Sequence, residues 1–259
     1  MNKSRLLLIL FLQRFLTALR FMTVIPVGWR TEDDSEHFHS CHLFFPLIGV
    51  LIGAIGWLLT QVSLLFFPQQ VVVVIALIYL AFISGCLHLD GLSDSADGLL
   101  CARPREKSLE IMKDSRVGAM GVVVVFFVLL AKYAALCSVD AKSLAPAIFF
   151  MPVIGRLSIL ITMATQKYGR PEGGLGRHFY AENSSTIALT SSIIVCLLLG
   201  LLSPQHLPFL IIFLVLAIFL FNKWCKARLG GATGDTLGAI CEIGEAVTAI
   251  SFSASLTFL

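Results

Sequence analysis

Charged residues are scarce in this sequence. Only 14% of the 259 residues are Asp, Glu, Lys or Arg, whereas 57% are apolar, and the formal net charge is only +3. A soluble domain of this length could not bury so much apolar surface, so the composition indicates that lipid is the solvent. The small net charge gives no indication of a nucleic-acid partner.

The sequence also lacks the patterns that would indicate other folds. Apolar runs such as Val71–Ile78 and Val122–Ala131 do not alternate with polar residues, which argues against a membrane β-barrel. The seven cysteines form no Cys-x-x-Cys pair and no metal-binding spacing, so we expect no disulfide framework. There is no internal repeat, low-complexity segment or Pro/Ser linker. These absences favour a single all-α domain over residues 1–259.

What the sequence does contain is a series of long apolar runs. A helix needs about 20 mostly apolar residues to cross a bilayer, and seven segments approach that length. They are Phe44–Phe67, Val71–Leu89, Gly118–Val139, Ala145–Thr165, Ser185–Ser203, Leu207–Phe221 and Thr236–Phe258. We therefore predict a polytopic transmembrane helical bundle with about seven spans.

The first 27 residues have a different pattern. On a helical wheel Arg14 and Arg20 lie on one side, and Phe15 and Met22 lie on the opposite side. This arrangement is typical of an amphipathic helix that lies in the membrane surface or re-enters it. No small-x-small cleavage site follows, so we do not expect a signal peptide.

Polar residues between the predicted spans fall mainly on one face of the membrane. The long segments 88–117, 166–184 and 222–235 share that face, whereas the opposite face has only tight connections. Most of the 19 Lys and Arg residues lie on the loop-rich face. Because short basic loops stay in the cytoplasm during insertion, we predict that this face is cytoplasmic.

The segment His88–Gly98, with the sequence HLDGLSDSADG, concentrates acidic residues at the edge of a span. At 100° per residue, Asp90, Asp94 and Asp97 fall within about 60° of one another on a helix. Three carboxylates on one face repel each other unless a cation neutralises them. Their hard oxygens suit Mg²⁺ or Mn²⁺, which proteins commonly share with substrate phosphates. The alternative is an ordinary solvated helix end.

Basic residues follow directly. A metal beside Arg and Lys is what a polyphosphate needs, so Lys113, Asp114 and Arg116 are candidates for substrate binding. The nearer basic cluster at 103–107 is explained equally well by the positive-inside rule.

Two further candidates stand alone. Arg177 ends the glycine-rich segment Gly169–Arg177, which is either a lid over a phosphate or only a connector. His88 borders the aspartates and belongs either to the site or to the core.

The last predicted span carries a second acidic group. Asp235 and Glu242 are seven residues apart and so share a helix face, with Glu245 within about a quarter turn. Ionisable groups inside a span are costly, so they normally face the bundle interior and mark a site. Arg156, midway through the fourth span, needs a counter-charge, and we predict an ion pair between Arg156 and Glu245. The predicted active site therefore combines residues 88–118 with residues 230–245.

The sequence resembles the adenosylcobinamide-GDP ribazoletransferase (cobalamin synthase) family over nearly its whole length. The most specific segments are DGLSDSADGL at 90–99 and IMKDSRVGAMG at 111–121. Weaker similar segments lie at 20–27, 45–49 and 234–239.

The resemblance implies a Mg²⁺-dependent reaction in the bacterial inner (cytoplasmic) membrane, with the active site facing the cytoplasm. The ribose 5′-oxygen of α-ribazole, or of its 5′-phosphate, is expected to attack the activated phosphoryl group of adenosylcobinamide-GDP. GMP leaves, and adenosylcobalamin or its 5′-phosphate is formed. The lipid bilayer is an expected partner, and a homo-oligomer and other enzymes of cobalamin biosynthesis are the protein partners to consider.

On this resemblance each candidate residue has an expected role. The expected Mg²⁺ ligands are Asp90, Asp94, Asp97, Asp235 and Glu242. Asp97 is the first choice for the general base, with Asp94 as the other catalytic carboxylate. Lys113, Arg116 and Arg177 are expected to hold the leaving GMP.

Two other functions fit part of the pattern. A CDP-alcohol phosphotransferase of lipid synthesis is also a membrane bundle with repeated aspartates, but its usual Asp-Gly-Ala-Arg motif is absent here. A divalent-cation transporter could use the acids as an ion path, but it should have polar groups through several spans and an outer vestibule. The crowding of acids on one side favours the enzyme.

Overall fold

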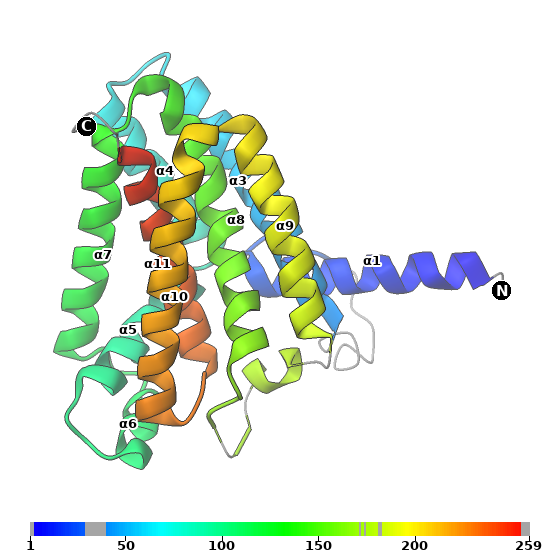
Figure 1. Cartoon of the computed structure of the whole chain (residues 1–259), viewed down its shortest axis with the longest axis vertical. Coiled ribbons are helices and arrows are strands. Elements are labelled where there is room, and N and C mark those ends of the chain that lie inside the picture. The colour runs from blue at the N-terminus through cyan, green and yellow to red at the C-terminus, as the bar shows by residue number, and fades with distance from the viewer. Residues whose placement is uncertain (1–2, 29–39, 171, 174, 181–182, 255–259) are drawn as a thin grey trace.

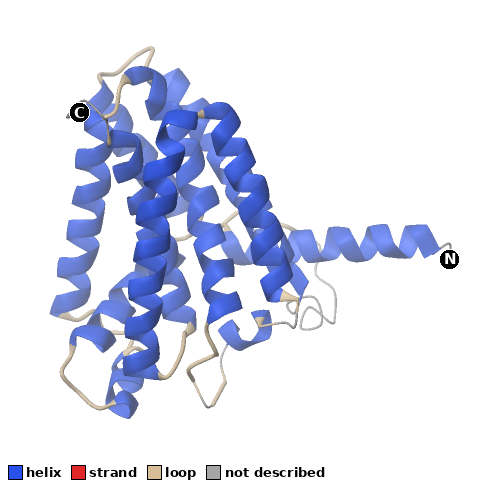
Figure 2. Cartoon of the chain, viewed as in Figure 1, coloured by secondary structure: helices blue, strands red, loops and turns tan. Residues whose placement is uncertain are grey.

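The computed structural model describes residues 3–28, 40–170, 172–173, 175–180 and 183–254. Within these residues every named element is a helix (Figure 2). The long helices are α1 (Lys3–Met22), α3 (Phe45–Ser63), α4 (Gln69–Ile83), α5 (Leu87–Leu100), α7 (Ala119–Ser138), α8 (Ala141–Thr165), α9 (Ser184–Leu202), α10 (Leu207–Leu229) and α11 (Gly234–Ser253). The shorter elements are η1 (His42–Phe44), α6 (Arg105–Ile111), η2 (Leu175–Phe179) and η3 (Pro204–His206). The predicted all-α fold is confirmed.

Five helices among the described residues are long and apolar enough to cross a membrane: η1 with α3, α7, α8, α9, and η3 with α10. The pair α4 and α5 adds a sixth if it is treated as one bent span. The structure thus supports five or six spans where the sequence predicted about seven. The last predicted span corresponds to α11, which carries three acids and is not among the five; residues 255–258 of that prediction lie outside the described residues.

The bundle is organised around α8. In its most apolar window 83% of the residues are buried, compared with 17% for α7 and 22% for α9 and α10. Helix α8 therefore lies at the centre of the bundle, whereas the outer helices turn large apolar side chains such as Phe127 outward, as a lipid-facing surface requires. Helices α3 and α11 pack against α8 on different sides.

The connections divide between the two ends of the bundle (Figure 1). The tight connections α3–α4, α7–α8 and α9–α10 lie at the upper end in this view. The longer segments around α6, around η2 and between α10 and α11 lie at the lower end. The grouping of polar loops at one end agrees with the sequence prediction.

A sharp bend places α5 across that lower end. The axes of α4 and α5 differ by 85°, and the residues between them include Gly85 and Cys86, both with φ near +58° (58° and 57°). Glycine adopts this left-handed conformation freely, whereas Cys86 does so against its usual preference. As a result α5 lies against α11 and α7 instead of continuing the line of α4.

Helix α1 extends sideways from the bundle, as expected for an amphipathic helix in the plane of the membrane surface (Figure 1). Its C-terminal part is anchored to the bundle, since Phe15 and Phe44 have ring centroids 5.8 Å apart and Met22 is buried.

Candidate active site

The three aspartates of α5 share one face of the helix, as predicted. Asp90 is exposed, whereas Asp94 and Asp97 are partly buried. This face meets the first turn of α11, where Asp235 lies. The approach is close because Gly91 has no side chain: a Cβ there would lie 2.7 Å from the Asp235 carbonyl oxygen. The fold therefore brings acids 145 residues apart in sequence (90 and 235) to one place.

Asp97 has a structural partner that the sequence did not indicate. Its Oδ2 accepts the backbone N–H of Gly118 at 2.8 Å, and its Oδ1 accepts that of Gly121 at 2.9 Å. These N–H groups begin α7, where the helix dipole favours a negative charge. Asp97 therefore caps the N-terminus of α7. Because both of its oxygens already accept hydrogen bonds, Asp97 is a weaker candidate for the general base, which was our first choice, and for a metal ligand.

Asp94 is the carboxylate with the most perturbed proton affinity in this region. Its burial, together with the charges of Asp90, Asp235 and Asp97, raises its pKa from 3.8 to about 6, against the opposing effect of Arg170. Asp94 lies one helical turn from Asp90 on the same face of α5. Unlike Asp97 and Asp235, it has no hydrogen-bond donor among the described residues.

Asp235 is held by a cation that sequence reasoning missed. Arg170 Nη2 lies 2.5 Å from Asp235 Oδ2, and both side chains are mostly buried. The loop that carries Arg170 is fixed to the start of α11, because Gly169 N–H donates to the Ala232 carbonyl at 2.7 Å and Ala232 N–H donates to the Lys167 carbonyl at 2.9 Å. The glycine-rich segment did indicate a basic loop near the site, but the spacing could not tell Arg170 from Arg177.

The predicted substrate-binding cations lie on the surface of the same end. Lys113 pairs with Glu172 at 2.6 Å, which joins the α6–α7 connection to the Arg170 loop. Arg116 pairs with Asp114 at 2.6 Å, and its side chain is 88% exposed. Arg177 is exposed. In the structure Lys113 and Arg116 therefore pair with acids at the surface and Arg177 is exposed; no ion pair joins these three cations to Asp90, Asp94 or Asp235 among the described residues.

A second ionic cluster lies inside the bundle. Arg156 Nη1 is 2.7 Å from Glu245 Oε1, so the structure places the two residues that we paired from the sequence in contact. Lys132 of α7 completes the cluster, at 2.6 Å from Glu242 and 2.8 Å from Glu245. The buried cluster (Lys132, Arg156, Glu242 and Glu245) has two positive and two negative side chains, as burial demands.

This cluster corrects the role expected for Glu242. We predicted it as a Mg²⁺ ligand facing the aspartates, but it is 5% exposed and bound to Lys132. Asp235 and Glu242 do share a face of α11, yet they lie two turns apart, so only Asp235 reaches the end of the bundle. Lys132, a cation inside an apolar run, was the available signal.

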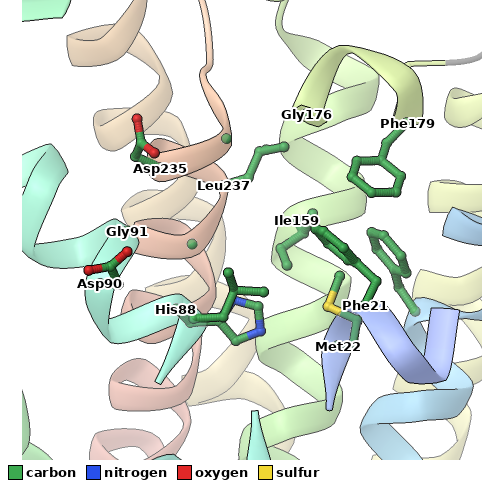
Figure 3. A pocket seen from close by; sticks show the side chains of 14 residues that line it. Phe21, Met22, His88, Asp90, Gly91, Ile159, Gly176, Phe179, Asp235 and Leu237 are labelled. Atoms are coloured by element: carbon green, nitrogen blue, oxygen red, sulfur yellow. The ribbon is translucent and has the colours of Figure 1, made fainter. Parts of the chain in front are cut away.

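A cavity of about 190 Å³ opens beside the carboxylates. Figure 3 shows Asp90 and Asp235 on one side of it and Phe21, Met22 and Phe179 on the other, with His88 between them. His88 is 3% exposed. The predicted site residue His88 thus belongs to the wall of this cavity.

The described residues contain no group of three or more His, Cys, Asp or Glu side chains placed to hold a metal ion together. Two carboxylates, Asp90 and Asp235, line the same cavity from facing helices. Mg²⁺ retains several waters and needs only one or two carboxylates when substrate phosphates supply further oxygens. The donor set therefore fits a magnesium ion that binds together with a phosphorylated substrate.

Comparison with known proteins places these features in a family. The family model described as cobalamin-5-phosphate synthase (CobS) matches residues 14–253. A protein of Clostridium botulinum (strain Loch Maree / Type A3) named adenosylcobinamide-GDP ribazoletransferase is 36% identical over 90% of this chain and 94% of its own length. A protein of the same name from Clostridium acetobutylicum is 32% identical over 96% of this chain and 98% of its own length. Another, from Alkaliphilus metalliredigens, is 37% identical over 90% of this chain and 92% of its own length. No solved structure matches.

Proposed function

The chain belongs to the cobalamin-5-phosphate synthase family, and on that premise we propose that it joins adenosylcobinamide-GDP to α-ribazole, or to its 5′-phosphate, with release of GMP. The observation that carries this proposal is the family match over residues 14–253. The convergence of α5 and α11 supports it, because it places Asp90 and Asp235 in the lining of one cavity, with Asp94 one helical turn from Asp90 on α5. A diphosphate needs such oxygen ligands for a metal, together with a cation for its own oxygens.

Asp90 and Asp235 are the residues that would hold Mg²⁺ against the diphosphate. When bound, the ion neutralises charge on the phosphoryl oxygens and on the departing phosphate. Arg170 would bind a phosphate oxygen beside the metal-binding carboxylates, since its Nη2 lies at the Asp235 carboxylate. It replaces Lys113, Arg116 and Arg177, the cations expected from the sequence, as our principal candidate for the diphosphate-binding cation.

Asp94 is the general base of the proposed reaction. A base works best when its pKa is near the working pH, and in the metal-free protein the pKa of Asp94 is raised to about 6, first of all by burial. Asp97 is less suitable because both of its oxygens accept backbone N–H groups.

The chemistry also corrects the expected nucleophile. The 5′-oxygen of a 5′-phosphorylated acceptor is already esterified, so the hydroxyl that both acceptors can use lies elsewhere on the ribose. That hydroxyl oxygen forms the new bond to the phosphorus attached to cobinamide, and its proton passes to Asp94. The bond from this phosphorus to the bridging oxygen breaks, and GMP departs with that oxygen.

The long apolar helices identify the chain as a membrane protein. We place it in the bacterial inner membrane with the carboxylate end in the cytoplasm. The grouping of the basic loops at that end supports this orientation.

The buried cluster argues against a cation transporter. Glu242 and Glu245 are neutralised by Lys132 and Arg156 inside the bundle, so they do not form an open path of acids.

The test is GMP release by the purified protein in detergent or nanodiscs. We expect GMP only when adenosylcobinamide-GDP, α-ribazole and Mg²⁺ are all present, and a corrinoid product that contains both parts. The Asp94→Asn variant should lose turnover. Asp140→Asn is the matched control, because Asp140 caps α8 at the opposite end and Asn is also a good cap. Equal activity of wild type and Asp94→Asn, or turnover independent of Mg²⁺, would contradict the proposed site.

A further inference from the structure

The cavity beside the carboxylates has two unlike ends. At one end lie Asp90 and Asp235, the carboxylates that we assign to binding Mg²⁺ and the diphosphate. At the other end Phe21, Phe45 and Phe179 form an aromatic cluster, with ring centroids 4.7 Å apart for Phe21–Phe179 and 5.5 Å apart for Phe45–Phe179. These rings come from α1, α3 and η2, which are remote in sequence. Such walls suit a flat apolar group joined to a polar one.

One residue that lines this cavity has a buried polar atom without a hydrogen-bond partner among the described residues. His88 Nε2 is buried and has no hydrogen-bond partner among the described residues. A buried polar atom without a partner destabilises the folded protein, so its retention needs an explanation. Because His88 lines the cavity, a ligand atom can supply the missing partner.

We propose that this cavity binds the heteroaromatic base of the acceptor nucleoside, with His88 Nε2–H donating to the base; the inference rests on the proposed function. A benzimidazole-type base is flat and apolar, and once one ring nitrogen is joined to ribose it has a single remaining polar atom, the imine nitrogen. That one acceptor matches His88 Nε2, a buried atom of the cavity wall that has no partner among the described residues. The ribose then extends toward Asp90, Asp94 and Asp235, where its hydroxyl reacts.

Other occupants fit less well. Guanine has several donors and acceptors on its edges; because the carboxylates Asp90 and Asp235 are assigned to Mg²⁺, the aromatic end of the cavity would leave most of these groups unpaired. A corrin ring is far larger than a cavity of about 190 Å³. A lipid chain would fill the aromatic end but would leave His88 Nε2 without a partner.

The first experiment compares two acceptors in two proteins. One acceptor is α-ribazole, and the other is its indole analogue, in which a C–H group replaces the imine nitrogen. For the wild type we expect the analogue to raise the acceptor KM about tenfold, the effect of losing one buried hydrogen bond.

His88→Leu should raise the KM for α-ribazole by a similar factor and should no longer distinguish the two acceptors. His88→Gln, which keeps an N–H donor, should recover part of the loss. The KM for adenosylcobinamide-GDP should stay within about twofold in both variants. If His88→Leu still distinguishes the acceptors, or if only the KM for adenosylcobinamide-GDP changes, the assignment is overturned.

The aromatic end is tested by Phe179→Ala, with Phe127→Ala as the control, since Phe127 is 60% exposed on the outer surface of α7. We expect weaker binding of α-ribazole, measured by calorimetry without the other substrate, for Phe179→Ala alone. Equal binding by both variants would contradict the proposal.

This measurement also separates the two proposals. Nucleoside binding that depends on His88, without any GMP release under the conditions above, would overturn the proposed reaction but not the cavity. Turnover with unchanged acceptor kinetics in His88→Leu would overturn the cavity assignment alone.

Discussion

Gly91 of α5 and Gly238 of α11 lie in backbone contact. A Cβ on Gly91 would come within 3.1 Å of the Gly238 Cα, and one on Gly238 would come within 3.2 Å of the Gly91 Cα. Small residues allow helices in membranes to approach this closely. The contact matters for function because it is what places Asp235 beside Asp90 and Asp94.

Gly91→Ala is therefore expected to push α5 away from α11. The new methyl group would meet backbone atoms, which cannot rotate aside, so we expect a loss of stability on the order of 1–3 kcal/mol and a larger loss of activity. Gly200→Ala in α9 is the control, because its nearest neighbour is a Leu207 side-chain atom at an ordinary 3.6 Å. Thermal unfolding in detergent, together with GMP release, distinguishes them. Comparable behaviour of the two variants would contradict the role of the contact.

The Arg156–Glu245 pair should dominate the stability of the bundle core. Glu245→Gln leaves Arg156 and Lys132 with a single buried carboxylate, and we expect destabilisation of about 3–5 kcal/mol. Glu110→Gln, which removes an exposed pair with Lys107, should change stability by less than about 1 kcal/mol. A double change of Lys132→Met and Glu242→Gln keeps the cluster neutral and should cost less than Glu245→Gln. Equal unfolding temperatures for Glu245→Gln and Glu110→Gln would refute this ranking.

Asp94 and Asp97 should respond differently to the same substitution. Asp94→Asn removes the proposed base and should lower kcat by about 10²–10⁴-fold with little effect on unfolding. Asp97→Asn replaces one of the two accepting oxygens by an NH₂ group, so one N–H at the start of α7 loses its partner, and we expect a loss of about 1 kcal/mol in stability and a smaller loss of kcat. If Asp97→Asn gave the larger fall in kcat at unchanged stability, the original assignment of Asp97 as the base would be restored.

The pH dependence of kcat/KM, which reports the free enzyme, should reflect Asp94. A base must be deprotonated to act, and the raised pKa means that Asp94 of the metal-free protein becomes protonated as the pH falls through about 6. We therefore expect kcat/KM to level off above this pH and to fall about tenfold per pH unit well below it. The residual rate of Asp94→Asn should lack this fall. A profile that stays flat to pH 4.5, or one that is identical in the variant, would exclude Asp94.

Arg170 and Arg177 allow a matched comparison within one loop. Arg170→Gln removes the cation at Asp235 and should raise the KM for adenosylcobinamide-GDP by about 10–100-fold, as expected for a lost charge-assisted contact. Arg177→Gln, at an exposed position, should change it less than threefold or so. Steady-state kinetics at saturating α-ribazole give both values. A larger effect of Arg177→Gln would return that residue to the site.

The features that could be predicted from the sequence are those that depend on local helix geometry or on the surrounding lipid. The apolar runs predicted a helical bundle because a bilayer leaves few alternatives for the backbone. The spacing of Asp90, Asp94 and Asp97 placed them on one helix face because helix geometry fixes that relation. Arg156 required an acid at similar depth, and the structure places Glu245 there.

Only the tertiary structure decided which of these groups are available for chemistry. Asp97 accepts hydrogen bonds from the first N–H groups of α7, and Glu242 forms an ion pair with Lys132. Arg170 forms an ion pair with Asp235, whereas Arg177 does not. The aromatic cavity likewise joins residues from α1, α3 and η2. The physical reason is that sequence spacing sets the direction of a side chain on its own helix, whereas its partner depends on how close two helices come. Here that distance depends on glycines such as Gly91, whose contact with Gly238 no local pattern specifies.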